Sequence, residues 1–344
     1  MARHSDAVVR RVPARVGLVG NPSDGYGGAV LGTVVPGLAA TVTAEHCDGI
    51  ELGGTASIDQ WRSTSEWRQH VGDVAPIGDH RIINAALWTL DDHIRTRHGP
   101  RRRPDDGHGV RLTWTTDIPR SVGLAGSSAL AVGVIEATAA LWDVSLDPRV
   151  VAALALSAER DVLGIAAGWQ DRIIQSFGGC VLVDAGSMAT VDGLSVPTVS
   201  VLAPCAALGA PISFLVGWNE ATATTSDGYH DPLRALASSL AVPMEGLAGL
   251  ARQAARAMTA GDVDELARAV DDGWKVRQAC APLRADHADL VEQVRSTGLA
   301  ATTPGSGGSV VTVCANEDRV VDAIAALEGA GCSWQRFGLP LPRM

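Results

Sequence analysis

The sequence predicts an α+β protein built from two domains, and three observations carry this prediction. The length of 344 residues suits two domains. A glycine-rich turn, "SVGLAGSSAL" at 121–130, joins a strand-like alternation at 110–119 to a helix pattern of small apolar residues at 127–142. The pattern restarts near residue 198 and finishes as strand, helix and strand, which is typical of an α+β domain. We therefore expect one domain over residues 1–195 and a second over 196–344.

Local patterns predict the elements of the first domain in order. Apolar and alternating runs predict strands at 15–20, 29–35, 41–46 and 110–119. Apolar side chains with helical spacing predict a helix at 79–98. Pro148 near the start and Gly164 at the end bound a helix at 147–164. The run 166–184 leads from a glycine break into a strand.

The second domain is predicted in the same way. Apolar runs indicate strands at 198–204, 211–218, 307–315 and 332–339. Helical spacing indicates helices at roughly 231–241, 245–260, 262–279, 285–297 and 317–331.

Charge and cysteine content exclude several classes of protein. The formal net charge is −10, from 28 basic and 38 acidic residues, so we expect neither a nucleic-acid nor a membrane-surface partner. The six cysteines form no CxxC pair and no metal-type cluster with histidine, which favours free thiols. The first residues lack a long apolar segment. We expect a cytoplasmic protein whose oligomeric state the sequence leaves open.

The turn at 121–130 has the composition of a phosphate-binding loop. Gly123 and Gly126 lead directly into a helix, so backbone N–H groups and the positive end of the helix dipole would face an anion. The hydroxyls of Ser127 and Ser128 would either bind Mg²⁺ or donate to a phosphate oxygen. Many Gly-Ser turns only cap a helix, and that alternative stays open here. The spacing matches neither a Walker loop nor a dinucleotide fingerprint.

Three other stretches carry residues suited to the same chemistry. Glu159 and Asp171 flank a glycine-containing loop, so one carboxylate would serve Mg²⁺ and the other would serve as a base, although capping and solvated roles are also open. "TTPGSGGSVV" at 302–311 is a second glycine-rich turn. "ARVGLVGNPSDGYGG" at 14–28 gathers Arg15, Asp24 and Tyr26 around a tight turn.

Taken together, the stretches "RVGLVGNPSDGYGG", "PRSVGLAGSSAL" and "PGSGGS" resemble the three motifs of the GHMP kinases, in the same order and over nearly the whole chain. Within that family, "GNPSDGYGG", "GLAGSSA" and "AGWQDRIIQSFGGCVLVD" are similar to the glucuronokinase-type sugar kinases, which phosphorylate an anomeric hydroxyl. The resemblance implies a GHMP kinase fold, with a ribosomal-protein-like N-terminal α/β domain and a ferredoxin-like C-terminal domain. It also implies ATP and Mg²⁺ as cofactors and a sugar or sugar acid as substrate.

The resemblance implies a role for each matched residue. Ser128 and Glu159 would hold Mg²⁺, Asp171 would act as a base or orient the acceptor hydroxyl, and Arg15 would offset charge near Asp171. The loop that would carry the ATP phosphates comprises Gly123, Leu124, Ala125, Gly126, Ser127 and Ser128. The residues that would support this loop are Gly305, Gly307 and Gly308. The residues that would border the sugar are Asn21, Asp24, Tyr26 and Gly27.

The third motif and the identity of the substrate leave alternatives open. Where many members have Lys-x-Thr-Gly, this chain has Thr302, Thr303, Pro304 and Gly305, so no lysine is present there. A uronate carboxylate would need an arginine, and the candidates are Arg172, Arg234 and Arg277. Alternative acceptors are a heptose phosphate, a cyclitol or an amino alcohol. A non-catalytic relative and an ATP-dependent decarboxylase are the alternatives from other classes.

Overall fold

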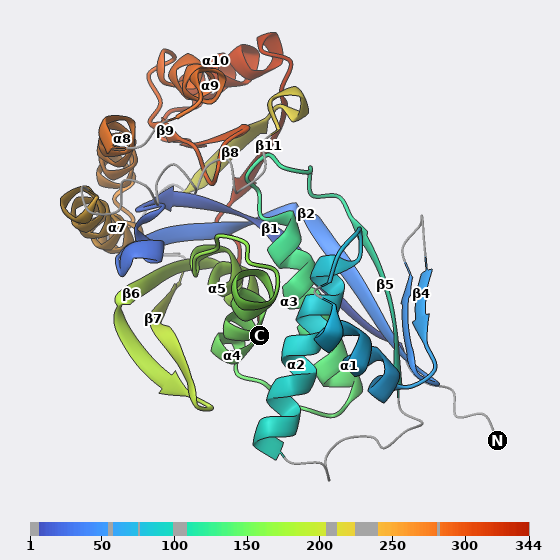
Figure 1. Ribbon diagram of the computed structural model, residues 1–344. Coiled ribbons are helices and arrows are strands. Elements are labelled where there is room, and N and C mark those ends of the chain that lie inside the picture. The colour runs from blue at the N-terminus through green and yellow to red at the C-terminus, as the bar shows by residue number, and fades with distance from the viewer. Residues whose placement is uncertain are drawn as a thin grey trace.

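The computed structural model describes residues 7–53, 58–74, 76–98, 109–203, 212–223, 240–280 and 283–343, and these form two sheets with helices packed against them (Figure 1). The first sheet has the strand order β4-β3-β5-β2-β6-β7, and β1 pairs with β2. The second has the order β11-β8-β10-β9. Strands β3 and β5 run parallel and every other pair among the described strands is antiparallel, so the expected α+β class is confirmed.

The elements of the first sheet and its helices are β1 (Val8–Val19), η1 (Ser23–Tyr26), β2 (Ala29–Cys47), β3 (Ile50–Gly53), β4 (Ile58–Trp61), α1 (Thr64–Asp73), α2 (Arg81–His98), β5 (Gly109–Thr116), α3 (Gly126–Leu141), α4 (Pro148–Ser157), the π-helical turn η3 (Ala158–Val162), α5 (Gln170–Phe177), β6 (Cys180–Val191) and β7 (Leu194–Leu202). Those that follow are β8 (Ser213–Trp218), η4 (Glu220–Thr222), α7 (Ala241–Ala260), α8 (Val263–Cys280), α9 (Ala285–Arg295), β9 (Ala301–Thr302), β10 (Ser309–Val313), α10 (Glu317–Gly329) and β11 (Ser333–Gly338).

Helix α3 is the central helix of the larger core. Its residues are small and apolar almost all round, and most of them are buried, as expected for a helix enclosed by other elements. It packs closely on the sheet, because a Cβ at Gly133 would lie 2.7 Å from Val42 Cγ2. Helices α1 to α5 lie together beside the first sheet in Figure 1.

Helices α7 and α8 connect the two sheets. They contact each other and also β1, while α7 contacts β2 as well (Figure 1). The strand β7 pairs with β6 in the first sheet, so the predicted boundary at 195/196 falls inside a strand of that sheet. The run at 198–204, expected in the second domain, therefore contributes to the first sheet. The two-domain division itself stays a prediction.

Several elements differ from the expectation in extent. The strands predicted at 29–35 and 41–46 are one strand, β2, which bends through an exposed stretch around Gly37 with a φ of 100°. The helix expected at 147–164 ends at Ser157 and continues as the π-helical turn. Helix α5 was not predicted. The helix expected at 231–241, and with it Arg234, lies almost wholly outside the described residues.

Two expectations from composition can be compared with the described residues. Five of the six cysteines lie there and all five are free thiols, as expected. Within the described ranges, every helix is too short or too polar to cross a bilayer.

Candidate active site

Arg15, on β1, joins three segments that are far apart in the sequence. Its Nη1 donates to the carbonyl oxygens of Gly123 at 2.7 Å and Pro304 at 3.0 Å. Its Nε donates to Asp171 Oδ1 at 2.6 Å, and Nη2 lies 2.6 Å from the same oxygen. The side chain is only 5% exposed, so these contacts are made away from bulk water, where charged hydrogen bonds are strong. One guanidinium group thus holds both glycine-rich turns and the candidate base together.

Asp171 lies between two guanidinium groups at the start of α5. Besides Arg15, it has Arg172 Nη1 at 3.4 Å from its Oδ2. The two guanidinium groups hold the carboxylate in place. Its side chain is 20% exposed and lines the cleft. A carboxylate oriented in this way can accept a hydrogen bond from an acceptor hydroxyl.

Asp24 caps the N-terminus of α5 from a distant part of the chain. Its Oδ2 accepts a hydrogen bond from the backbone N–H of Gln170 at 2.8 Å. Gln170 is the first residue of α5, so its N–H has no carbonyl partner within the helix. Burial, with a smaller contribution from nearby Asp171, raises the pKa of Asp24 to about 6 despite the lowering effect of the Gln170 hydrogen bond. This cap fixes the direction in which Asp171 leaves the helix.

Glu159 is buried on the π-helical turn and has two partners. It accepts from the Ser127 hydroxyl at 2.8 Å and forms an ion pair with Arg172 Nη2. Arg172 also donates to the Gly168 carbonyl at 2.9 Å. Burial, followed by the neighbouring Arg15, lowers the pKa of Arg172.

The expected pair of Ser128 and Glu159 is not formed. Ser128 is fully buried, and its hydroxyl donates to Gln175 Oε1 at 2.7 Å and to the Ala125 carbonyl at 3.2 Å. Because α3 begins at Gly126, successive residues of its first turn point about 100° apart. Ser127 therefore faces the cleft and Ser128 faces the core. Which of the two binds a metal stays a proposal.

The two glycine-rich turns pack directly on each other. A Cβ at Gly305 would lie 2.4 Å from the Gly123 carbonyl oxygen, and one at Gly123 would lie 2.9 Å from the Gly307 carbonyl oxygen. Gly308 lies against Val122, whose carbonyl accepts from the Ser309 hydroxyl at 2.6 Å. The turn lacking the family's lysine is held instead by Arg277 of α8, which donates to the carbonyls of Thr303 at 2.6 Å and Gly305 at 3.1 Å.

These groups surround one cleft with a volume of about 380 Å³. The predicted site residues that line it are Arg15, Asn21, Asp24, Tyr26, Ser127, Glu159, Asp171, Arg172 and Gly305. The predicted site residues outside the lining are Gly27, Gly123, Leu124, Ala125, Gly126, Ser128, Gly307 and Gly308. Arg277, a candidate for binding the substrate carboxylate, also lies outside the lining, because it is buried against the glycine-rich turn that contains Thr303 and Gly305.

The cleft lining also contains residues that the sequence did not predict. Among them are Arg160, Gly168, Gln170 and Ser306. Arg160 directly follows Glu159, and Gln170 directly precedes Asp171. Adjacency to these two predicted carboxylates is the sequence feature that could have identified them as site residues. The lining contains three guanidinium groups, from Arg15, Arg160 and Arg172, and three carboxyl groups, from Asp24, Glu159 and Asp171.

Comparisons with known proteins agree with this arrangement. The family model for the GHMP kinases N terminal domain matches residues 81–179, and the model for the GHMP kinases C terminal matches residues 252–331. Glucuronokinase 1 of Arabidopsis thaliana is 26% identical over 323 residues, which is 90% of this chain and 85% of that protein. D-glycero-alpha-D-manno-heptose 7-phosphate kinase of Campylobacter jejuni is 45% identical over 64 residues, or 19% of each chain.

A solved structure extends the likeness to the whole fold. Lactococcus lactis galactokinase complexed with galactose aligns with a TM-score of 0.74 at 15% identity, covering 98% of this chain and 94% of that one. The expected GHMP kinase fold is therefore confirmed. With both family domains matched and the motif residues gathered around one cleft, the chain belongs to the GHMP kinases, ATP-dependent phosphotransferases that have an alcohol group as acceptor.

Proposed function

We propose that this kinase phosphorylates the anomeric hydroxyl of a uronic acid of the glucuronate type. The observation that carries the proposal is the meeting of Arg15, Asp171 and the pair Ser127–Glu159 at one cleft bordered by residues 21–26. The likeness to glucuronokinase 1 over 90% of the chain supports the choice of acceptor.

The chain's own residues supply orientation and charge. Asp171 accepts a hydrogen bond from the acceptor hydroxyl and takes up its proton as that oxygen forms its bond to the γ-phosphorus of ATP, while the bond from that phosphorus to the bridging oxygen breaks and ADP leaves. Arg15 keeps Asp171 in place and puts positive charge beside the transferred group, where oxygens become more negative. The N-terminus of α3 directs backbone N–H groups at the phosphates.

The residues present suit a magnesium ion held mainly by the nucleotide. Among the described residues, no three His, Cys, Asp or Glu side chains converge to hold a metal. Mg²⁺ commonly binds through one or two protein oxygens together with substrate phosphates and waters. The Ser127 hydroxyl and the Glu159 carboxylate, 2.8 Å apart, offer two such oxygens. When bound, the ion neutralises phosphate charge.

The test is ADP release from MgATP with a panel of acceptors. The panel contains glucuronate, galacturonate, glucose, galactose, heptose phosphates, cyclitols, homoserine and mevalonate. We expect kcat/KM for each uronate to exceed that for its neutral sugar. Neutral sugars that react equally well or better would contradict the uronate and leave the kinase activity standing.

The Asp171→Asn variant tests the proposed base in the same assay. Loss of a general base typically lowers kcat by roughly 10²–10⁴-fold, and we expect a change in that range with little effect on ATP binding. A variant that keeps its kcat would restrict Asp171 to holding Arg15.

A heptose phosphate is the second candidate acceptor. The 45% identity to the heptose 7-phosphate kinase over 64 residues favours it. A heptose phosphate that outperforms every uronate in the panel would replace the first assignment.

A further inference from the structure

Two of the three guanidinium groups in the cleft are committed to the protein. Arg15 donates to Asp171 and to two backbone carbonyls. Arg172 pairs with Glu159, donates to the Gly168 carbonyl and lies beside Asp171. Both side chains are buried, and turning either one toward a ligand would take the closest cation from the half-buried Asp171 or from the buried Glu159.

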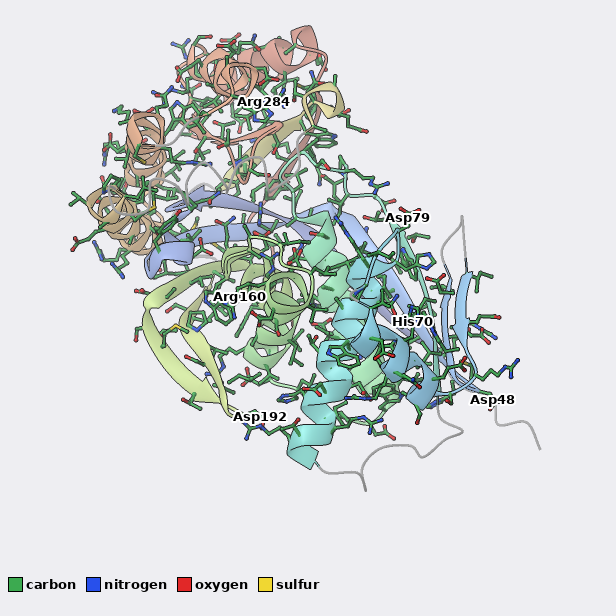
Figure 2. The ribbon with its side chains drawn as sticks, in the orientation of Figure 1. Asp48, His70, Asp79, Arg160, Asp192 and Arg284 are labelled. Carbon is green, nitrogen blue, oxygen red and sulfur yellow. The ribbon has the colours of Figure 1, made fainter. Side chains whose placement is uncertain are left out.

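Arg160 is different from the other two. Its side chain is 54% exposed, and its partner is the adjacent Asp161, which is 52% exposed, with Nε 2.8 Å from Oδ1. Exposed ion pairs of this kind contribute little, so the guanidinium can exchange Asp161 for a ligand at small cost. In Figure 2, Arg160 lies beside the helices that pack on the first sheet, well away from Arg284.

We propose that Arg160 is the specificity-determining residue that binds the anionic group of the acceptor. The proposal rests on the proposed function and deepens it, because that function requires a cation for the substrate carboxylate. A planar guanidinium binds a carboxylate through two parallel N–H donors, which a neutral sugar cannot match. Arg160 is the exposed arginine of the cleft lining, so it offers both donors at once.

The position of Arg160 assigns it to the acceptor rather than to the nucleotide. The chain leaves Arg160 through residues 165–168, which also line the cleft. Gly168 lies against Asp24, because a Cβ there would be 2.5 Å from Asp24 Oδ2. This wall therefore leads from Arg160 to the turn that borders the sugar. The phosphates have their own donors in the turn before α3.

The test compares Arg160→Gln and Arg160→Lys with a matched control, Arg268→Gln. Arg268 is an exposed arginine of α8 that pairs with its neighbour Glu265 and lies outside the cleft lining. For each protein, kcat/KM is measured with glucuronate and glucose, and with a heptose phosphate and its parent heptose. The KM for MgATP is measured as well. Calorimetry measures the binding of glucuronate and of the heptose phosphate without ATP.

We expect Arg160→Gln to reduce the ratio of kcat/KM for glucuronate over glucose by roughly 10- to 100-fold, the worth of a charged hydrogen-bonded contact. Arg160→Lys should recover part of the ratio, and Arg268→Gln should leave it at the wild-type value. If instead only the ratio for the heptose phosphate over its heptose falls, the anion is a phosphate.

Three results would overturn the assignment. The first is an equal fall for charged and neutral acceptors with a raised KM for MgATP, which would place Arg160 on the nucleotide. The second is binding of both anions that Arg160→Gln leaves unchanged. The third is no binding of either anion by the wild type. Anion binding that depends on Arg160 in a protein that turns over none of these acceptors would keep the site and reject the proposed function.

Discussion

Ser127 and Ser128 are neighbours in the sequence and lie in different surroundings. Ser127 is exposed in the cleft and donates to Glu159, whereas Ser128 is buried and donates to Gln175. We therefore propose Ser127, rather than the expected Ser128, as the hydroxyl that reaches a nucleotide-bound cation.

Replacing each serine by alanine separates the two roles. We expect Ser127→Ala to raise the Mg²⁺ concentration needed for half-maximal activity. Ser128→Ala should mainly lower the free energy of unfolding, by about 1 kcal/mol for one lost hydrogen bond. Activity titrated with Mg²⁺ and unfolding in urea measure the two effects. The reverse pattern would return the metal to Ser128.

Asp24 makes the stability of the protein depend on pH. Its folded-state pKa of about 6 lies above the ordinary 3.8, so the folded protein retains a proton that the unfolded chain loses between these values. Stability from this residue is therefore highest at low pH and falls as the pH rises from about 4 to 6, by about 3 kcal/mol in total.

Asp24→Asn removes this titration. Urea unfolding of both proteins at pH 4, 5, 6 and 7 should show the variant gaining stability relative to the wild type as the pH rises. Parallel curves for the two proteins would show that Asp24 does not titrate in this range.

At the scale of elements, the contact between the two glycine-rich turns requires glycine. Gly305→Ala would push a methyl group against the Gly123 carbonyl, and a backbone atom cannot move aside as a flexible side chain would. We expect a loss of about 1–3 kcal/mol in the free energy of unfolding, together with a fall in kcat, because Gly123 also holds Arg15.

Gly246→Ala is the control for this substitution. Gly246 is exposed on α7, and a Cβ there would meet no atom within 4 Å. Alanine favours the helix, so this variant should be stabilised by about 0.5–1 kcal/mol. Thermal unfolding and the kinase assay compare the two variants. A stable and active Gly305→Ala protein would mean that the turns separate easily.

The elements that the sequence predicted are those whose pattern is local. Helix α3 is identifiable because small apolar residues follow a glycine turn, and β10 because the β-branched run at 310–313 follows another. Helix α5 has only eight residues, and its cap comes from Asp24, 146 positions away. No local pattern contains such a cap.

The candidate site was predictable in its parts and not in its contacts. The carboxylates Glu159 and Asp171 stand out by type and spacing. That Ser127 rather than Ser128 meets Glu159 depends on the residue at which α3 begins. That Arg160, on the π-helical turn, stays exposed while Arg172, on α5, becomes buried depends on how these two elements pack in the folded chain.

At the scale of the whole molecule, the last described residues hold the first sheet's helices together. Arg343 donates to both oxygens of Glu136 on α3, at 2.9 and 2.7 Å, and its backbone N–H donates to the Phe177 carbonyl at the end of α5. Burial raises the pKa of Glu136, while Arg343 opposes that rise. The C-terminal segment thus joins the helix that follows the phosphate turn to the helix that carries Asp171.

Arg343→Gln should lower the free energy of unfolding by about 1–3 kcal/mol at pH 7, because it leaves the Glu136 charge buried without its cation. The deficit should shrink as the pH falls toward the raised pKa of Glu136, because the carboxylate then takes up a proton and loses its charge.

The double variant Glu136→Gln with Arg343→Gln is the control. It should regain part of the lost stability, because no buried charge then lacks a partner. Equal losses for the single and double variants in urea unfolding would show that the tail acts through its backbone alone.

The equal numbers of guanidinium and carboxyl groups around the cleft bear on how ligands arrive. The protein as a whole carries a net charge of −10, while the cleft lining is balanced. We therefore expect an approaching nucleotide to be repelled at long range by the net negative charge of the protein. Salt shortens the range of that repulsion. Capture of anionic substrates should consequently become faster as ionic strength rises toward the physiological value, the opposite of an enzyme whose field steers its substrate inward.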